Sequence, residues 1–297
     1  MIEGPALTPS RSKVLLLVIG LTLVWGTNWV LFPLAVREVS VWTFRAICLL
    51  GSGALLLFIA RIRGLSLYIP PKQRVSLTVA ALVYLVIWNV GSTYSAILIP
   101  SGQAAVLGFT MPLWATLISW TVLGERPSRS TVLGVVLATG GVACLAFGAR
   151  HSYASAPLGF VLGLSAGIAW ACGTLILKRA KLTVPLLVST GWQLVIGGVP
   201  ILFVALASYS PHAPAPSWTT VLVIGYITVV PMALGNIAWF SIVDSMPATL
   251  SGLSTAMVPM IAMVTGAYFR GEPLGPIEIT AMVLSGAALL ITLRKRR

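Results

Sequence analysis

The chain has 297 residues, of which 58% are hydrophobic and only 8% are charged, and its mean hydropathy is +0.98. A water-soluble domain of this size cannot bury so much apolar surface, so the composition excludes a soluble globular protein and indicates that lipid surrounds most side chains. The formal net charge is +13, but the basic residues lie in short clusters between long uncharged segments, which is typical of membrane-protein loops. We therefore expect an integral membrane protein that contacts the lipid bilayer and has no nucleic-acid partner.

Ten apolar segments follow one another along the chain, each long enough for a helix that crosses the hydrocarbon layer, which needs about 20 residues. They are 14–36, 41–60, 75–97, 101–123, 130–148, 158–177, 184–207, 217–243, 248–269 and 273–293. The first segment follows Arg11 and Lys13 without a cleavage site, so we interpret it as a retained helix and not as a signal peptide. The sequence therefore predicts an all-α membrane protein with ten transmembrane helices.

The distribution of Lys and Arg predicts the orientation of these helices, because cytoplasmic loops carry an excess of both. With the N-terminus in the cytoplasm, fifteen basic residues are cytoplasmic, whereas only Arg37, Arg150 and Arg270 are clearly external. The fifteen are Arg11, Lys13, Arg61, Arg63, Lys72, Arg74, Arg126, Arg129, Lys178, Arg179, Lys181 and 294–297. We expect both chain ends in the cytoplasm.

The sequence repeats itself at an interval of 147 residues. The segment "GFTMPLWATLISWTVLGERPS" at 108–128 aligns with "TAMVPMIAMVTGAYFRGEPLG" at 255–275, and the alignment extends without a gap into the preceding helix. The paired residues include Asn89 with Asn236, Pro112 with Pro259, and Gly124–Glu125 with Gly271–Glu272. The third, fourth and fifth segments thus match the eighth, ninth and tenth, which predicts two five-helix repeats at 1–150 and 151–297.

Five crossings in each repeat is an odd number, so the second repeat is expected to lie upside down relative to the first. Two similar bundles of opposite orientation can exchange conformations, which opens a central cavity to one side of the membrane and then to the other. The arrangement predicts alternating access, the mechanism of a carrier.

The segment "YSAILIPSGQAAVLGFTMPLWATLISWTVLGERPS" at 94–128 resembles the signature of the EamA-type drug/metabolite transporter superfamily, including its Leu-Gly-Glu-Arg-Pro ending. The second repeat departs from this pattern, with "RGEPLGP" at 270–276. The resemblance covers the whole chain and implies two inverted five-helix repeats, a small-molecule substrate and export through a bacterial inner membrane. Within the superfamily, the size and the tryptophan-rich interior are most similar to the aromatic amino acid exporters of the YddG type. Carriers of drugs or nucleotide-sugar-like solutes are the first alternative, and a narrow channel is another.

A membrane-embedded hydrolase is the alternative outside transport, because "GLSAG" at 163–167 fits the Gly-x-Ser-x-Gly nucleophile elbow around Ser165. That motif requires a strand, a helix and a nearby histidine, whereas these residues lie inside an apolar helical segment. Gly159, Gly163 and Gly167 instead have the small-xxx-small spacing that brings membrane helices into close contact. We expect helix packing there and no enzyme, and the sequence contains no phosphate-binding, cofactor-binding or metal-ligating motif.

Amide and aromatic side chains within the spans are the candidate substrate-binding residues. A polar side chain is costly in lipid, so it faces protein or a watery cavity, and an aromatic chamber with a few amides suits an amino acid with an apolar side chain. The candidates are Trp25, Asn28, Tyr84, Trp88, Asn89, Gln103, Trp170, Asn236 and Trp239. Interhelical hydrogen bonds and plain packing are the competing interpretations. Trp42, Trp120 and Trp218 are expected at the membrane interfaces.

The six acidic residues all fall in loops or near helix ends. A carboxylate or histidine near the midplane is usual in proton-coupled carriers, so we expect facilitated diffusion or weak coupling. Arg45 is expected to reach the outer surface or to pair with Glu38, although it could instead bind a substrate carboxylate.

Two prolines are expected to soften repeat-related helices at mid-length, because each frees a carbonyl of the preceding turn. Pro112 frees the carbonyl of Gly108, and Pro259 frees that of Thr255. These four residues are the hinge candidates.

Overall fold

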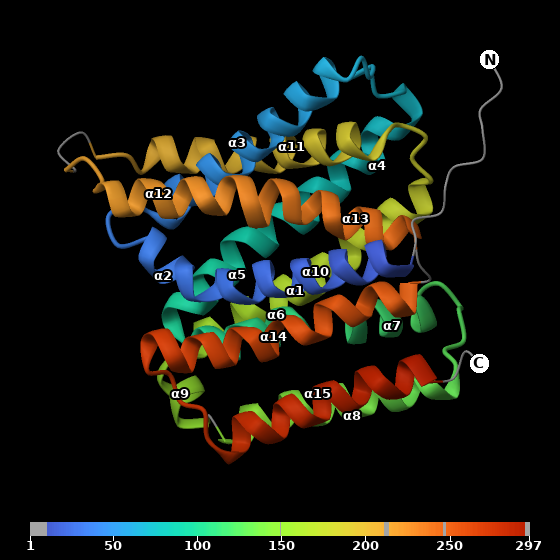
Figure 1. Ribbon diagram of the computed structural model, residues 1–297, viewed down its shortest axis with the longest axis vertical. Helices are drawn as coiled ribbons and strands as arrows, with labels where there is room; N and C mark the ends of the chain where they lie inside the picture. Colours follow the sequence, from blue (N-terminus) through green and yellow to red (C-terminus); the bar gives the residue numbers. More distant parts are fainter. Residues whose placement is uncertain (1–10, 149, 211–213, 246–247, 295–297) are drawn as a thin grey trace.

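The computed structural model describes residues 11–148, 150–210, 214–245 and 248–294, and within these ranges the regular structure is entirely helical (Figure 1). In the first half the helices are α1 (Arg11–Asn28), η1 (Trp29–Leu31), α2 (Phe32–Ala35), α3 (Val41–Ile62), α4 (Pro71–Ala81), η2 (Leu82–Val86), α5 (Ile87–Leu98), α6 (Ser101–Gly108), α7 (Met111–Thr121) and α8 (Arg129–Gly148). In the second half they are α9 (Arg150–Ser155), α10 (Pro157–Ala180), α11 (Leu186–Ala207), α12 (Trp218–Ile227), η3 (Thr228–Leu234), α13 (Gly235–Ser245), α14 (Ala248–Arg270) and α15 (Pro276–Arg294).

Seven stretches of the described residues are long and apolar enough to cross a bilayer. They are Leu16–Ala35, Val41–Ile62, Pro71–Leu98, Ser101–Thr121, Pro157–Ala180, Leu186–Ala207 and Trp218–Trp239. The other three expected segments coincide with α8, α14 and α15. The all-α prediction is confirmed, and the count of ten crossings stays a prediction.

Large apolar side chains cover the outer faces of several helices. Phe58 of α3, Phe203 of α11 and Leu222 of α12 are 63%, 67% and 69% exposed. Exposure on this scale would be unfavourable in water, and it is expected where lipid is the solvent.

Helices α3 and α11 form a close antiparallel pair, one from each half of the chain. A Cβ atom on Gly53 would lie 2.9 Å from the carbonyl oxygen of Gly191, and one on Gly198 would lie 2.8 Å from Leu50. Residues nearer the N-terminus of α3 therefore contact residues nearer the C-terminus of α11, so the two helices are antiparallel. The second helices of the two halves run in opposite directions.

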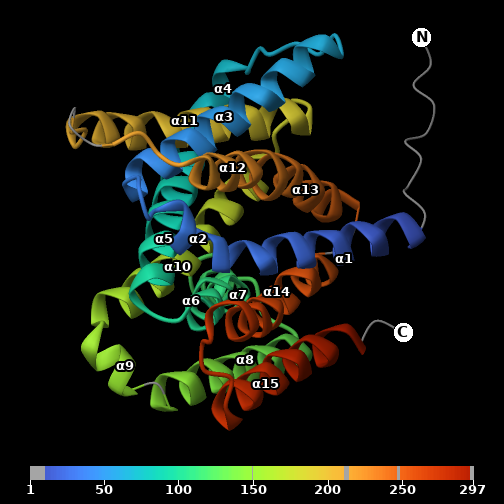
Figure 2. The same cartoon turned by 60° about the vertical axis from the view of Figure 1, so that its left-hand side comes forward.

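Contacts between helices are paired across the two halves. The repeat-related helices α3 and α11, α6 and α14, and α8 and α15 pack on each other, and α8 lies beside α15 at one edge of the bundle (Figures 1 and 2). Likewise, α1 packs on α14 as α10 packs on α6, and α1 packs on α13 as α10 packs on α5. Exchanging the halves leaves this set of contacts unchanged, as a two-fold arrangement requires.

The two copies of the Gly-Glu signature share one backbone geometry. Gly124 and Gly271 adopt φ values of 70° and 62°, which glycine reaches without steric cost. The next amide donates to a carbonyl six residues earlier in both copies: Glu125 to Ser119 at 2.9 Å, and Glu272 to Gly266 at 3.2 Å. The repeat found in the sequence is thus a repeat of local structure.

Glycines on one face of α10 bring this helix against α5 and α6. A Cβ atom on Gly159 would lie 2.9 Å from Leu98, and one on Gly167 would lie 2.8 Å from the carbonyl oxygen of Gly108. Ser165 lies in the middle of this continuous helix and not at a strand-to-helix turn. The packing interpretation of "GLSAG" is confirmed.

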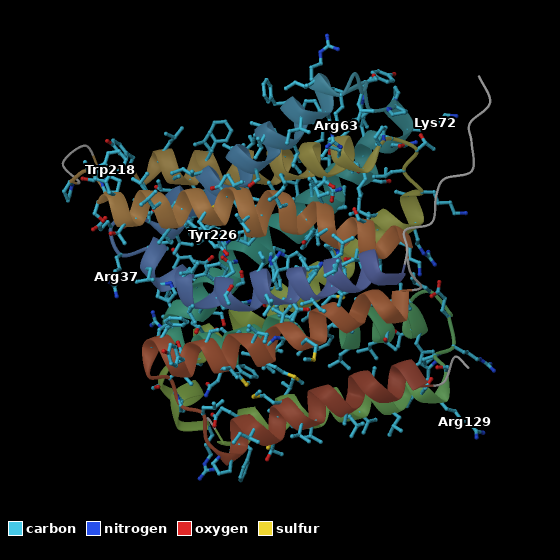
Figure 3. The ribbon with its side chains drawn as sticks, viewed as in Figure 1. Arg37, Arg63, Lys72, Arg129, Trp218 and Tyr226 are labelled. Atoms are coloured by element: carbon cyan, nitrogen blue, oxygen red, sulfur yellow. The ribbon has the colours of Figure 1, made fainter. Side chains whose placement is uncertain are left out.

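Basic and aromatic side chains mark the two ends of the bundle (Figure 3). Lys72 and Arg129 lie at one end, here called the Lys72 end, and Arg37 and Trp218 lie at the other, here called the Arg37 end. Trp120 and Trp218 are 53% and 80% exposed, as interfacial residues are expected to be.

The connection before α3 is tied to the start of α12 by Glu38. Its Oε2 accepts a 2.6 Å hydrogen bond from the backbone N–H of Ser217. Hydrogen bonds from the Thr220 hydroxyl, and then from the backbone and hydroxyl of Ser217, lower the pKa of Glu38 from its ordinary value of 4.5. The carboxylate thus completes the cap of α12.

Glu38→Gln is expected to lower the thermal unfolding midpoint slightly at neutral pH. A carboxyl whose pKa falls on folding stabilises the native state above its unfolded pKa, and this contribution is lost as the pH falls through the native value. The difference between wild type and variant should therefore shrink as the pH falls below about 4.5. Thermal scans of purified protein at several pH values measure this, and a difference independent of pH would contradict it.

Candidate functional site

Two π-helical turns interrupt repeat-related helices near the centre of the molecule. They cover Leu82–Val86 and Thr228–Leu234, and an asparagine follows each turn closely. Asn89 Nδ2 donates to the carbonyl of Leu85 at 2.8 Å, and Asn236 Nδ2 donates to that of Met232 at 2.6 Å. A π-helical turn leaves irregularly paired carbonyls and is frequent at functional sites. Here a carbonyl of each turn accepts a hydrogen bond from the Nδ2 of the asparagine and so fixes the side-chain amide.

Trp170 of α10 is the centre of an aromatic cluster that joins the two halves. Its ring lies 4.6 Å from the ring of Trp88, 5.9 Å from Trp25 and 5.8 Å from Trp239, measured between centroids. It stacks on Tyr84 at 6.0 Å. Trp25 Nε1 also donates to the carbonyl of Pro231 at 2.9 Å, inside the second π-helical turn.

A cavity with an open mouth lies against this cluster, and its interior has about 50 Å³ of space that the centre of a water molecule can reach. Its lining residues are Trp25, Asn28, Trp29, Phe32, Arg45, Tyr84, Leu85, Trp88, Asn89, Phe109, Trp170, Ile227, Pro231, Met232 and Asn236. They come from both halves of the chain.

Seven of the nine candidates from the sequence line this cavity. Gln103 does not, because its Nε2 points to Glu278 Oε1 on α15 at 3.4 Å. Trp239 supports the wall from behind, packed on Trp25 and Trp170. The cavity geometry thus brings most candidates together, and substrate binding by them stays a prediction.

Several polar atoms around the cavity have no hydrogen-bond partner within the described structure. They are the Oδ1 atoms of Asn28 and Asn89, Nε1 of Trp170 and Nη2 of Arg45. A buried polar atom without a partner costs about 1–3 kcal/mol, and such atoms are rare. The residues that line the cavity thus include two acceptors and two donors without a partner.

The interpretation of Arg45 as a surface residue is wrong. Its side chain is only 1% exposed, its Nε donates to Thr93 Oγ1, and it lines the cavity. The guanidinium carbon lies 4.2 Å from the ring centroid of Phe32. Glu38 binds Ser217 instead. The position of Arg45 near the start of α3 suggested that its side chain is exposed, but residues of α2 and α5 cover this part of α3.

Sequence reasoning missed Trp29, Phe32 and Phe109 among the lining aromatics. Trp29 and Phe32 follow Trp25 and Asn28 at the three- and four-residue spacing of one helix face, so this signal was present in the sequence. Phe109 follows the end of α6, and its place in the wall depends on the break in that helix.

The two hinge-candidate helices differ in the structure. The first is broken: α6 ends at Gly108, and α7 begins at Met111 with Pro112 in its first turn. The second, α14, runs continuously from Ala248 to Arg270 through Pro259. Thr255 lies in this helical backbone, and its side chain is outside the described part. Because Phe109 lines the cavity, the break between α6 and α7 lies at the cavity wall.

These features define a class of protein: a multi-pass helical membrane transporter, with repeated halves around a cavity. The chain belongs to the EamA-like transporter family, whose model matches residues 12–147 and 157–294, once in each half.

Curated relatives agree with this assignment. The chain is 29% identical to the "Uncharacterized transporter YvbV" of Bacillus subtilis (strain 168), over 95% of this chain and 90% of the relative. It is 26% identical to the "Uncharacterized inner membrane transporter YedA" of Escherichia coli (strain K12), over 93% and 89%. A "Probable amino-acid metabolite efflux pump" of Salmonella typhimurium is 25% identical over 65% of this chain and 67% of that protein. The chain is thus an inner-membrane transporter and not an enzyme.

Proposed function

We propose that this protein is an alternating-access exporter of amino acids, including aromatic and other apolar ones. The observation that carries the proposal is the cavity, whose walls combine stacked aromatic rings with unpaired amide oxygens. Aromatic faces suit an apolar side chain, and polar atoms fix the orientation of a solute. The resemblance to YddG-type exporters and the name of the Salmonella relative favour amino acids and outward transport.

The proposed architecture has ten transmembrane helices in two inverted repeats, residues 1–150 and 151–297, with both chain ends in the cytoplasm. The antiparallel pairing of α3 and α11 supports the inversion. The basic residues Lys72 and Arg129 at one end support a cytoplasmic Lys72 end.

Alternating access is supported by the difference between the repeat-related helices, one broken at Gly108 and one continuous through Pro259. Exchange of these two shapes would exchange the open side of the cavity. Gly108, Pro112, Thr255 and Pro259 remain the proposed hinge positions.

Transport is proposed to run down the substrate gradient, because the lining residues include no acidic residue or histidine. The described carboxylates of Glu272 and Glu278 lie instead near the ends of α14 and α15.

Purified protein in liposomes is expected to take up labelled phenylalanine, and unlabelled phenylalanine on the far side should accelerate this uptake. Such acceleration distinguishes a carrier from a channel. Asn89→Ala should reduce uptake roughly tenfold, which corresponds to a loss of about 1.4 kcal/mol of binding free energy. Trp120→Phe at the interface should leave uptake unchanged.

Accumulation driven by a pH gradient alone would contradict uncoupled transport. Uptake of nucleotide sugars or cationic drugs, with no uptake of amino acids, would contradict the proposed substrate class.

A further inference from the structure

Arg45 places a buried cation beside the cavity, and no carboxylate of the described residues pairs with it. The side chain is 1% exposed, and its Nη2 is buried and makes no hydrogen bond within the described structure. The contacts it does make are a hydrogen bond to the Thr93 hydroxyl and the faces of Phe32 and Phe44, at 4.2 and 4.6 Å. A hydroxyl and two aromatic rings leave the positive charge uncompensated.

Three of the described acidic side chains are engaged elsewhere, and a fourth, Glu125, is exposed in the loop after α7. Glu38 accepts from Ser217, Glu272 pairs with Arg270 at 2.9 Å, and Glu278 accepts from Gly275 and Gln103. Burying an unpaired charge is strongly unfavourable, and the cavity lining includes no acidic residue. An anionic group that enters the cavity would therefore remove this cost.

The hydrogen bonds of Thr93 fix the position of the guanidinium relative to the first amide. The Thr93 hydroxyl accepts from Arg45 Nε and donates to the carbonyl of Asn89 at 2.7 Å. Thr93 is four residues after Asn89, one turn along α5. Arg45 and Asn89 are thus linked through Thr93, and both residues line the cavity.

We propose that Arg45 is the specificity-determining residue for this site and that its Nη2 binds the carboxylate of the substrate. The Oδ1 atoms of Asn28 and Asn89 accept hydrogen bonds from the neighbouring ammonium group of the same molecule. The substrates are then zwitterions that carry both groups. Neutral or cationic aromatic solutes bind weakly, because they have no carboxylate for Arg45 to bind. This inference deepens the proposed function and rests on it.

Binding of phenylalanine and of phenylalaninamide to the purified full-length protein tests the proposal. The two ligands differ only in the carboxylate, and at about pH 6 both ammonium groups are protonated. Quenching of tryptophan fluorescence reports binding, because Trp25, Trp29, Trp88 and Trp170 line the cavity. Wild type should bind phenylalanine roughly 10- to 100-fold more tightly than the amide, as for a charge-assisted hydrogen bond.

Arg45→Gln should bind the two ligands with similar, weak affinity, whereas the matched control Arg37→Gln, on the loop before α3, should keep the wild-type preference. The wild-type comparison alone remains decisive if Arg45→Gln does not fold. Equal binding of acid and amide by wild type would overturn the role of Arg45 and leave the proposed function standing. Binding of neither ligand, together with no phenylalanine uptake, would overturn the proposed function and this inference with it.

Discussion

Glu272→Gln is expected to separate the ends of α6 and α14 at the Arg37 end of the bundle. The Glu272 carboxylate accepts from the Ser101 hydroxyl at 2.8 Å to each oxygen and from the Gly102 N–H at 3.3 Å. It also pairs with Arg270 at 2.9 Å and is only 11% exposed. The contact holds the N-terminus of α6, in the first repeat, to the loop after α14, in the second.

Removing the charge while keeping the shape should weaken this contact by about 2 kcal/mol, because hydrogen bonds to charged groups contribute about 1.5–3 kcal/mol. The N-terminus of α6 adds to the loss, since it favours a negative charge. A change of this size shifts a two-state equilibrium roughly 30-fold. In the proposed cycle, this shift raises the population of the state that is open at the Arg37 end.

Spin labels at Leu98→Cys and Tyr268→Cys measure this separation, because both positions are exposed, at 41% and 82%. Cys48, Cys144 and Cys172 are first replaced by Ala so that only the new thiols react. Glu272→Gln should raise the fraction of the longer distance. Glu125→Gln is the matched control, because this repeat-related carboxylate is exposed and lies after α7, four residues before Arg129 at the Lys72 end. A longer distance in both variants, or in neither, would contradict the prediction.

Gly53→Ala is expected to destabilise the folded protein by about 1–3 kcal/mol, as overpacking of a close contact does. The added Cβ would lie 2.9 Å from both the Gly191 carbonyl oxygen and the Val195 nitrogen. Both are backbone atoms of α11, so no side-chain rotation relieves the clash. The helices α3 and α11 would have to move apart, and the pairing of the two halves would weaken.

Thermal unfolding of the purified protein in detergent measures this effect. Gly225→Ala is the control, because a Cβ at Gly225 meets no atom within 4 Å. Alanine is also the better helix former by about 1 kcal/mol, so Gly225→Ala should leave the midpoint unchanged or raise it. Equal midpoints for the two variants would contradict the close contact of α3 and α11.

The positions of the helices could be predicted from the sequence because hydropathy is a local property. Each of the ten apolar segments coincides with one helix or with a row of consecutive helices. The 147-residue repeat likewise predicted equivalent structure, and Gly124 and Gly271 share their left-handed backbone as a result. The amides Asn89 and Asn236 were found for the same reason, since a polar residue in an apolar segment is conspicuous.

The direction in which a side chain points was decided only by the tertiary structure. Arg45 is buried because Phe32 and Thr93, which come from α2 and α5, cover it, and no local pattern around residue 45 reports those partners. Gln103 turns to Glu278, although it lies in the same kind of apolar segment as Asn89. Which face of a helix meets the cavity depends on helices distant in sequence, whereas the apolar segments themselves are encoded residue by residue.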